Sequence, residues 1–146
     1  MMVTSVLTLC TGNICRSPIA EFVLAERLPD CDVSSAGLHA MVGRDTDPGS
    51  ALAGQHLGVT VRKHIARQFT ADLGAAADLI LVMDSGHLQE LRARHPDLSS
   101  KAFLLRCDRK TSDVPDPYRQ GIANHYRAVE LIIEGCEDWV KKLRKI

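Results

Sequence analysis

Residues 9–18 have the sequence LCTGNICRSP and stand between an apolar run and an amphipathic one. The run before them, 3–9, predicts a strand buried on both faces, and apolar residues recur at helical spacing from Ile19 onward. The stretch therefore predicts a turn from a strand into a helix, the start of a βαβ unit. It carries Cys10 and Arg16, whose side chains can take part in chemistry.

The composition of this turn is typical of a phosphate-binding loop. Gly12 can take a positive φ, and Asn13 is the next most tolerant residue for a left-handed conformation, so successive amide N–H groups can point inward around an oxyanion. Ser17 is a good N-cap and Pro18 suits the first helical position, which predicts that the helix begins at the exit of the loop. Taken alone, Cys10 would ordinarily be a buried core residue and Arg16 a solvated surface residue. The whole ten-residue context favours a phosphate-binding loop instead.

Cys10 and Arg16 suit nucleophilic phosphoryl transfer. A helix N-terminus and a neighbouring arginine both favour the thiolate form of Cys10. The planar fork of Arg16 can bind two oxygens of one phosphoryl group, and the amides of residues 11–16 can hold the equatorial oxygens. A thiolate attacks phosphorus without help from a metal, so we expect neither a metal nor a cofactor.

The irregular stretch 106–121 is too long for an ordinary connection and is a candidate functional loop. Within it, Asp116 is the best candidate for a general acid, because a carboxylic acid in a flexible loop can protonate the leaving oxygen and then activate water. Asp113 is an alternative acid. Tyr118 could line the cleft and stack on an aromatic leaving group.

Bulk composition narrows the class of protein. A chain of 146 residues predicts one domain, 1–146. The 18 acidic residues balance 18 basic ones and aromatic residues make up 4%, which argues against a nucleic-acid partner. Residues 1–4 lack a cationic start, and the run 3–9 is too short for a signal core or a membrane span, so we expect a cytoplasmic protein without membrane insertion.

Cysteine and histidine spacing predicts no metal site. The 5 cysteines are an odd number without paired zinc spacing, which disfavours a disulfide framework and favours reduced thiols. The 6 histidines include no pair at metal-binding helical spacing.

Strands and helices alternate along the chain. Apolar strands are expected at 3–9, 31–35, 79–83 and 102–105. One helix should start at Asp47-Pro48 and stop at Gly58, another should be capped by Asp84 or Ser85 and end at His95-Pro96, and a last one should carry an apolar stripe over 122–143. The alternation predicts an α/β fold with a doubly wound parallel sheet and a site at the carboxyl ends of its strands.

The loop resembles that of the low-molecular-weight protein tyrosine phosphatases. Further motifs run in the family's order over nearly the whole chain; they are SSAGL (34–38), VGR (42–44), DP (47–48), HIARQ (64–68), LILVMD (79–84) and DPY (116–118). The segment 114–119, VPDPYR, is most similar to the bacterial branch associated with capsule and exopolysaccharide export.

The resemblance implies a four-stranded parallel sheet flanked by helices on both faces, and hydrolysis of phosphotyrosine through a phosphocysteine intermediate. It implies catalytic roles for Cys10, Arg16 and Asp116. The residues that it implies for substrate binding are Thr11, Gly12, Asn13, Ile14, Cys15, Ser17 and Tyr118.

The resemblance also implies supporting contacts and a partner. Ser17 would donate to the thiolate and Asn13 would brace the loop, with Ser35 and His64 as further supports. Cys10 and Cys15 would form a reversible oxidation pair. The substrate would be a tyrosine-phosphorylated protein, an autophosphorylated bacterial tyrosine kinase.

Two departures from the sequence pattern of related proteins bear on the substrate, and two alternative functions have to be weighed. Residues 38–41 and Arg119 replace aromatic positions of eukaryotic members, whereas Ile14 stands where related arginine phosphatases have Thr, which favours phosphotyrosine. A thiol-coupled arsenate reductase would need two further cysteines close together, and only Cys107 lies in a plausible region. A non-catalytic phosphate-binding module would normally have lost the thiol or the acid.

Overall fold

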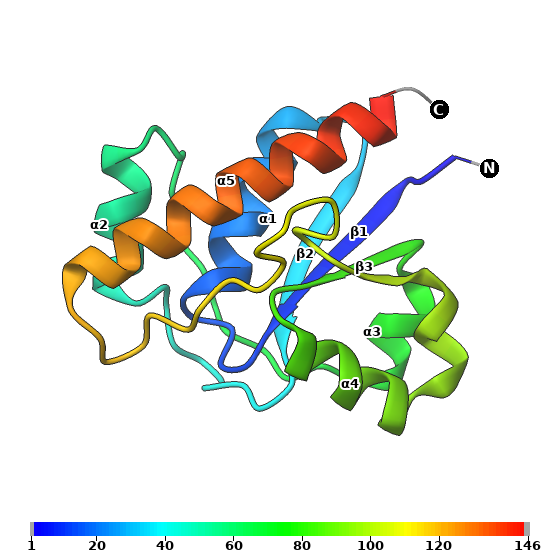
Figure 1. Ribbon diagram of the computed structural model, residues 1–146. Coiled ribbons are helices and arrows are strands. Elements are labelled where there is room, and N and C mark those ends of the chain that lie inside the picture. The colour runs from blue at the N-terminus through cyan, green and yellow to red at the C-terminus, as the bar shows by residue number, and fades with distance from the viewer. Residues whose placement is uncertain (1, 145–146) are drawn as a thin grey trace.

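Four parallel strands form the centre of the computed structural model, which describes residues 2–144. The strands are β1 (Ser5–Cys10), β2 (Asp32–Gly37), β3 (Leu79–Val82) and β4 (Ala102–Leu104). Their order in the sheet is β2-β1-β3-β4 (Figure 1). The two strands at the centre, β1 and β3, are also the most buried, because both of their faces are covered.

Helices cover both faces of this sheet (Figure 1). On one face lie α1 (Arg16–Arg27), α2 (Pro48–His56) and α5 (Ile122–Arg144). On the other lie α3 (Ala71–Ala76) and α4 (Ser85–Arg94), followed by the 3₁₀ helix η1 (Pro96–Lys101). No helix within residues 2–144 has the length and apolar character needed to cross a bilayer.

Side-chain alternation along β1 divides the core into two layers. Val6 and Cys10 belong to the cluster that packs against α1 and α5, whereas Leu7 and Leu9 belong to the cluster beneath α3 and α4. Both faces of β1 are therefore anchored, which fixes its register and the position of Cys10 at its carboxyl end.

The predicted fold is confirmed, with α3 and η1 as additions that the apolar pattern did not indicate. Asp47 caps α2 and Asp84 caps α4, each by accepting a main-chain hydrogen bond, and Gly58 takes φ 89° just beyond α2. One helix start was wrong. The helix α1 begins at Arg16, and Ser17 does not cap it, because its hydroxyl is used inside the cysteine loop. Pro18 is tolerated because the first four N–H groups of a helix have no intrahelical acceptor.

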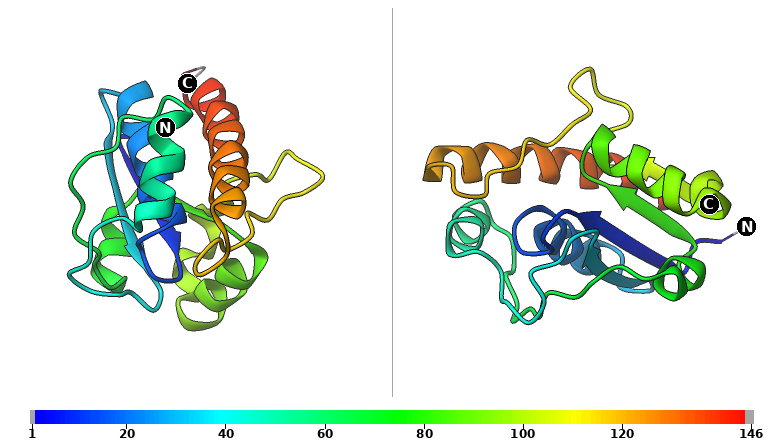
Figure 2. Two further views of the ribbon diagram at one scale, coloured as in Figure 1. Left: turned by 90° about the vertical axis from the view of Figure 1, so that its left-hand side faces the viewer. Right: turned by 90° about the horizontal axis from the view of Figure 1, so that it is seen from below.

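The last helix buries a wider face than the predicted stripe. Cys136 and Trp139 are buried core residues, as expected, while Ile122 at its start is exposed. The segment between β4 and α5, yellow in Figure 2, has no helix or strand, and part of it projects outward beside α5. It brings residues 114–118 to the carboxyl edge of the sheet, next to the turn that follows β1.

Candidate active site

The turn after β1 forms a cradle of inward-pointing amide groups. The main-chain carbonyls of residues 10–14 all accept hydrogen bonds from outside the loop. Their donors are the N–H groups of Leu38, His39, Met41 and Asp47 and the ring Nε2 of His64, at 2.6–2.9 Å. Because a trans peptide unit is planar, each outward carbonyl turns the next N–H inward, so the amides of residues 11–15 converge on one point. The start of α1 adds its own free N–H groups.

Asn13, and not Gly12, takes the left-handed conformation in this loop, at φ 59°. Of the two residues that could take this conformation, Asn13 takes it, and three side-chain hydrogen bonds hold it in place. Its Nδ2 donates to Ser17 Oγ and Ser35 Oγ, both at 2.9 Å, and its Oδ1 accepts from the main-chain N–H of Arg67. A glycine is needed instead at Gly37, where a Cβ atom would lie 2.5 Å from the Thr11 carbonyl oxygen.

Cys10 is buried, and its Sγ lies 2.9 Å from Ser17 Oγ. The serine oxygen already accepts a hydrogen bond from Asn13 Nδ2, so its own hydrogen can point at the sulfur at 2.9 Å, which is nearer than its other acceptor, the Ala36 carbonyl oxygen at 3.4 Å. A hydroxyl that donates to sulfur stabilises the thiolate, and the converging amides add positive potential. These neighbours place Cys10 Sγ to act as a nucleophile.

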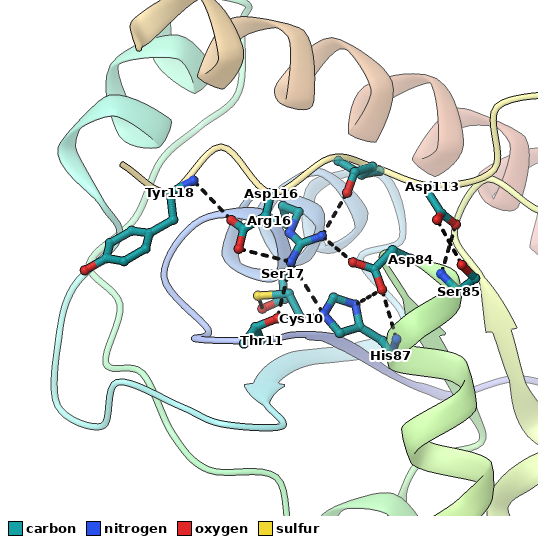
Figure 3. Close-up of polar contacts among 11 residues, drawn as sticks. Cys10, Thr11, Arg16, Ser17, Asp84, Ser85, His87, Asp113, Asp116 and Tyr118 are labelled. Atoms are coloured by element: carbon teal, nitrogen blue, oxygen red, sulfur yellow. Dashed lines mark hydrogen bonds and ion pairs between the residues drawn. The ribbon is translucent and has the colours of Figure 1, made fainter. Parts of the chain in front are cut away.

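Arg16 is almost completely buried, and its guanidinium has both anchored and free donors (Figure 3). Nη1 donates to Asp84 Oδ2 and to the carbonyl oxygen of Val114, each at 2.8 Å. Nε has no hydrogen-bond partner among the described residues. A buried guanidinium N–H without an acceptor is costly, so this donor suits an oxygen of a bound anion.

Two site residues, Asp84 and His87, were not predicted: the sequence indicated Asp84 only as a helix cap and as the last residue of the motif at 79–84, and His87 not at all. His87 Nε2 lies 2.8 Å from Thr11 Oγ1 and 3.4 Å from Arg16 Nη2, and its Nδ1 lies 3.3 Å from Asp84 Oδ1. Their position in the sequence could have indicated them, because both follow the predicted strand at 79–83, whose carboxyl end was expected at the same edge of the sheet as Cys10.

The pKa values of these two groups are both lowered. Burial lowers the pKa of His87, and the charge of Arg16 lowers it further. For Asp84, burial raises the pKa, but hydrogen bonds from the His87 main chain and from Arg16 outweigh it, so the net shift is downward. The pair therefore favours a carboxylate and a neutral imidazole beside Arg16.

The two candidate acids lie in different places (Figure 3). Asp116 Oδ2 lies 3.7 Å from Arg16 Nη2, the Asp116 side chain is 49% exposed, and its Oδ1 accepts from the Tyr118 N–H. Asp113 instead accepts hydrogen bonds from Ser85 N and Oγ, both at 2.9 Å. The alternative acid therefore anchors the loop to α4, and only Asp116 faces the cradle.

A pocket opens over the cradle, and every predicted substrate-binding residue except Asn13 and Ser17 lines it. Its lining combines polar and apolar side chains. The lining residues are Cys10, Thr11, Gly12, Ile14, Cys15, Arg16, His39, Met41, Asp116 and Tyr118. Asn13 and Ser17 are buried beneath it, as supports of the loop.

The five cysteines are all free thiols. Cys15 lies in the same loop as Cys10, but burial raises the pKa of its thiol to about 12, and a hydrogen bond with Ser50 opposes this only in part. Cys31 precedes β2 at the amino edge of the sheet, Cys136 is buried under α1, and Cys107 is exposed in the long loop. The described residues contain no pair of further cysteines placed to relay oxidation from Cys10.

A thiol in an amide cradle, with a buried arginine and a facing carboxyl group at the carboxyl edge of a parallel sheet, defines a phosphatase of the cysteine-dependent class. The sequence profile of one family, "Low molecular weight phosphotyrosine protein phosphatase", matches residues 5–146. The chain belongs to this family.

Individual relatives cover almost the whole chain. The chain is 39% identical over 145 residues to the probable low molecular weight protein-tyrosine-phosphatase EpsP of Ralstonia nicotianae, a match that spans 99% of each chain. The crystal structure of the tyrosine phosphatase Wzb from Escherichia coli K30 in complex with sulphate superposes with a TM-score of 0.94 at 33% identity, covering 97% of this chain and 99% of that one. Vibrio vulnificus Wzb in complex with benzylphosphonate gives a TM-score of 0.92 at 37% identity, with 97% and 99% covered.

Proposed function

We propose that the protein hydrolyses phosphotyrosine on proteins, with Cys10 as nucleophile, Arg16 as phosphate anchor and Asp116 as general acid. One observation carries the proposal. The unpartnered Nε of Arg16 and the inward amides of residues 11–15 define a place for three phosphoryl oxygens directly beside Cys10 Sγ. Asp116, at the open side, is the carboxyl group nearest to where a leaving oxygen would lie.

The reaction has two steps. In the first, the Cys10 thiolate attacks phosphorus, the bond to the tyrosine oxygen breaks, and Asp116 gives its proton to the departing phenolate. In the second, a water attacks phosphorus while the Asp116 carboxylate takes its proton, the bond to sulfur breaks, and phosphate leaves. The cradle and Arg16 stabilise the charge on the equatorial oxygens in both steps.

The mouth of the pocket favours an aromatic substrate. Ile14 and Cys15 pack with Ala66, and the side chains of Met41 and Tyr118 lie against them, which gives the entrance apolar walls. A phosphotyrosine ring would fill this entrance while its phosphate reaches the recessed thiol, whereas phosphoserine is too short to do both. The benzylphosphonate held by a relative likewise joins an aromatic ring to a phosphonate.

For the partner, we propose the autophosphorylated tail of a bacterial tyrosine kinase that controls exopolysaccharide export, acted on in the cytoplasm. The resemblance of residues 114–119 to the bacterial capsule branch supports this, as does the similarity to EpsP and Wzb. Basic Arg44 touches Met41, and Arg119 lies over the Tyr118 ring, so both flank the entrance and would attract an acidic phosphorylated chain.

The test compares kcat/KM on matched phosphotyrosine, phosphoserine and phosphoarginine peptides. We expect a clear preference for phosphotyrosine, and a phosphoryl group on Cys10 in acid-quenched reactions analysed by mass spectrometry. Comparable rates on phosphoserine or a preference for phosphoarginine would contradict the assignment. Arsenate reduction without phosphatase turnover would favour the reductase alternative.

Variants complete the test. Cys10→Ser should lose turnover but keep phosphate binding, because the cradle is mostly main chain. Cys107→Ser is the matched control, since it changes an exposed thiol far from the cradle and should leave turnover intact. Activity above about 10% of wild type in Cys10→Ser would remove the nucleophile assignment.

A further inference from the structure

Three side chains of types that commonly bind metal ions lie together at the cysteine loop. The sulfur of Cys15, a carboxylate oxygen of Asp47 and a ring nitrogen of His125 all lie within 4.8 Å of one another. Cys15 and His125 are buried, and Asp47 is partly buried. They come from the residue before α1, the N-cap of α2 and the first turn of α5, whose start lies beside α2 (Figures 1 and 2).

The distance between the His125 ring and the Asp47 carboxylate suits two ligands of one small ion better than it suits a direct hydrogen bond. His125 Nε2 and Asp47 Oδ1 are 3.7 Å apart, which is too long for a hydrogen bond. Two ligands of a tetrahedral zinc ion, each bound at about 2.0 to 2.2 Å, lie roughly 3.4 Å apart. A shift of a few tenths of an ångström would therefore bring both atoms onto one ion.

Neighbouring groups already hold these ligands in place. His125 Nδ1 shares a 2.8 Å hydrogen bond with Ser50 Oγ, which fixes the plane of the ring. Asp47 Oδ1 accepts from Gly49 N at 3.0 Å, and the main-chain N–H of Asp47 donates to the Ile14 carbonyl. Gly49 also makes room for the imidazole, since a Cβ atom there would lie 2.8 Å from Nε2. Such outer contacts orient the first ligands of metal sites.

We propose that Cys15, Asp47 and His125 bind a zinc ion. One thiolate, one imidazole and one carboxylate form a borderline-soft donor set that suits zinc and is poor for magnesium or calcium. On binding, the Cys15 thiol releases its proton to solvent, its sulfur bonds to the metal, and water fills the fourth position. Because Cys15 lines the pocket, an occupied site would fix one wall of the phosphate cradle to α2 and α5.

The experiment titrates cobalt(II), a spectroscopic substitute for zinc, into the full-length Cys10→Ser protein, which removes the other thiol of the loop. We expect one equivalent to give tetrahedral visible bands and a sulfur-to-cobalt charge-transfer band, both removed by added zinc. The further change Cys15→Ser should abolish the charge-transfer band. Cys107→Ser, the control for an exposed thiol, should leave it unchanged.

Two further variants test the other ligands. Asp47→Asn keeps the helix cap and removes the charge, and His125→Gln keeps a hydrogen-bonding side chain; each should weaken cobalt binding by at least about tenfold. Zinc at about 100 times its Kd should raise the melting temperature of the parent by about 5 to 10 °C, and metal-free melting curves show that each variant is folded. No charge-transfer band, a band that survives Cys15→Ser, or unchanged affinity in both Asp47→Asn and His125→Gln would overturn the proposal.

Discussion

Arg16 Nη1 and Asp84 Oδ2 lie 2.8 Å apart, although 68 positions separate the two residues in the chain. The carboxylate comes from the residue that caps α4, so the end of β3 sets the direction of an arginine that follows β1. With the Val114 carbonyl, Asp84 occupies Nη1, while Nε has no partner among the described residues. We therefore expect Asp84 to be a positioning residue for Arg16, the proposed phosphate anchor.

Asp84→Asn is expected to reduce kcat/KM for p-nitrophenyl phosphate by roughly 10²-fold, because a displaced guanidinium no longer meets the phosphoryl oxygens. The cap of α4 survives, since Asn caps as well as Asp. Asp138→Asn, which breaks the exposed pair with Arg109, is the matched control and should change activity little. Unchanged kcat/KM in Asp84→Asn would contradict the positioning role.

Asp116→Asn should slow hydrolysis of phosphotyrosine by roughly 10² to 10⁴, the usual contribution of a general acid. The loss should be smaller for acidic phenols, which leave without a proton. Asp113→Asn should cost less than Asp116→Asn, because it loosens the contact with Ser85 and removes no proton donor from the cradle. Burst kinetics on a series of aryl phosphates measure both effects, and equal losses for all phenols would argue against leaving-group protonation.

His87 should make the protein less stable in mild acid. Burial and Arg16 lower its pKa below the ordinary 6.5, so the unfolded chain binds more protons than the folded one. The contribution of His87 to the free energy of unfolding has its full value above about pH 6.5, and it declines as the pH falls through the pKa of His87 in the folded protein. Melting temperatures of wild type and His87→Gln across this range check the prediction, and parallel pH dependences in the two proteins would refute it.

Cys15 should form a disulfide with Cys10 only slowly after peroxide has oxidised Cys10. Attack on a Cys10 sulfenic acid needs the Cys15 thiolate and releases water, but burial raises the pKa of Cys15 to about 12. Disulfide formation should therefore accelerate with pH, by up to about tenfold per unit below that pKa. Peptide mapping after timed peroxide treatment at several pH values gives the rate, and a rate independent of pH would show that thiolate formation is not limiting.

Arg44 and Arg119 should make the KM for acidic phosphopeptides sensitive to salt. Their charges flank the entrance and do not touch the cradle, so raised ionic strength should increase KM more than it lowers kcat. Arg44→Gln combined with Arg119→Gln should remove most of this dependence. Salt titrations on wild type and the double variant provide the comparison; equal salt dependence would place the attraction elsewhere.

The sequence by itself determined the alternation of strands and helices and the loop that joins the first pair. Apolar runs and helical spacing are local patterns, and the parallel connection rule converts them into a sheet with its site at the carboxyl edge. The loop from Cys10 to Arg16 was also readable, because its polar and turn residues serve one another over short distances. The sequence did not reveal where α1 begins or which loop residue takes a positive φ, since side-chain hydrogen bonds within the loop decided both.

The tertiary structure alone decided which distant side chains support the loop. Asp84 and His87 reach Arg16 and Thr11 only because β3 pairs with β1, and Asp113 anchors the long loop only because Ser85 begins α4 nearby. The meeting of Cys15, Asp47 and His125 likewise depends on α2 packing against the start of α5. Spacing in sequence carries no information on such contacts, because a side chain's partner is fixed by how separate elements pack, and not by their order along the chain.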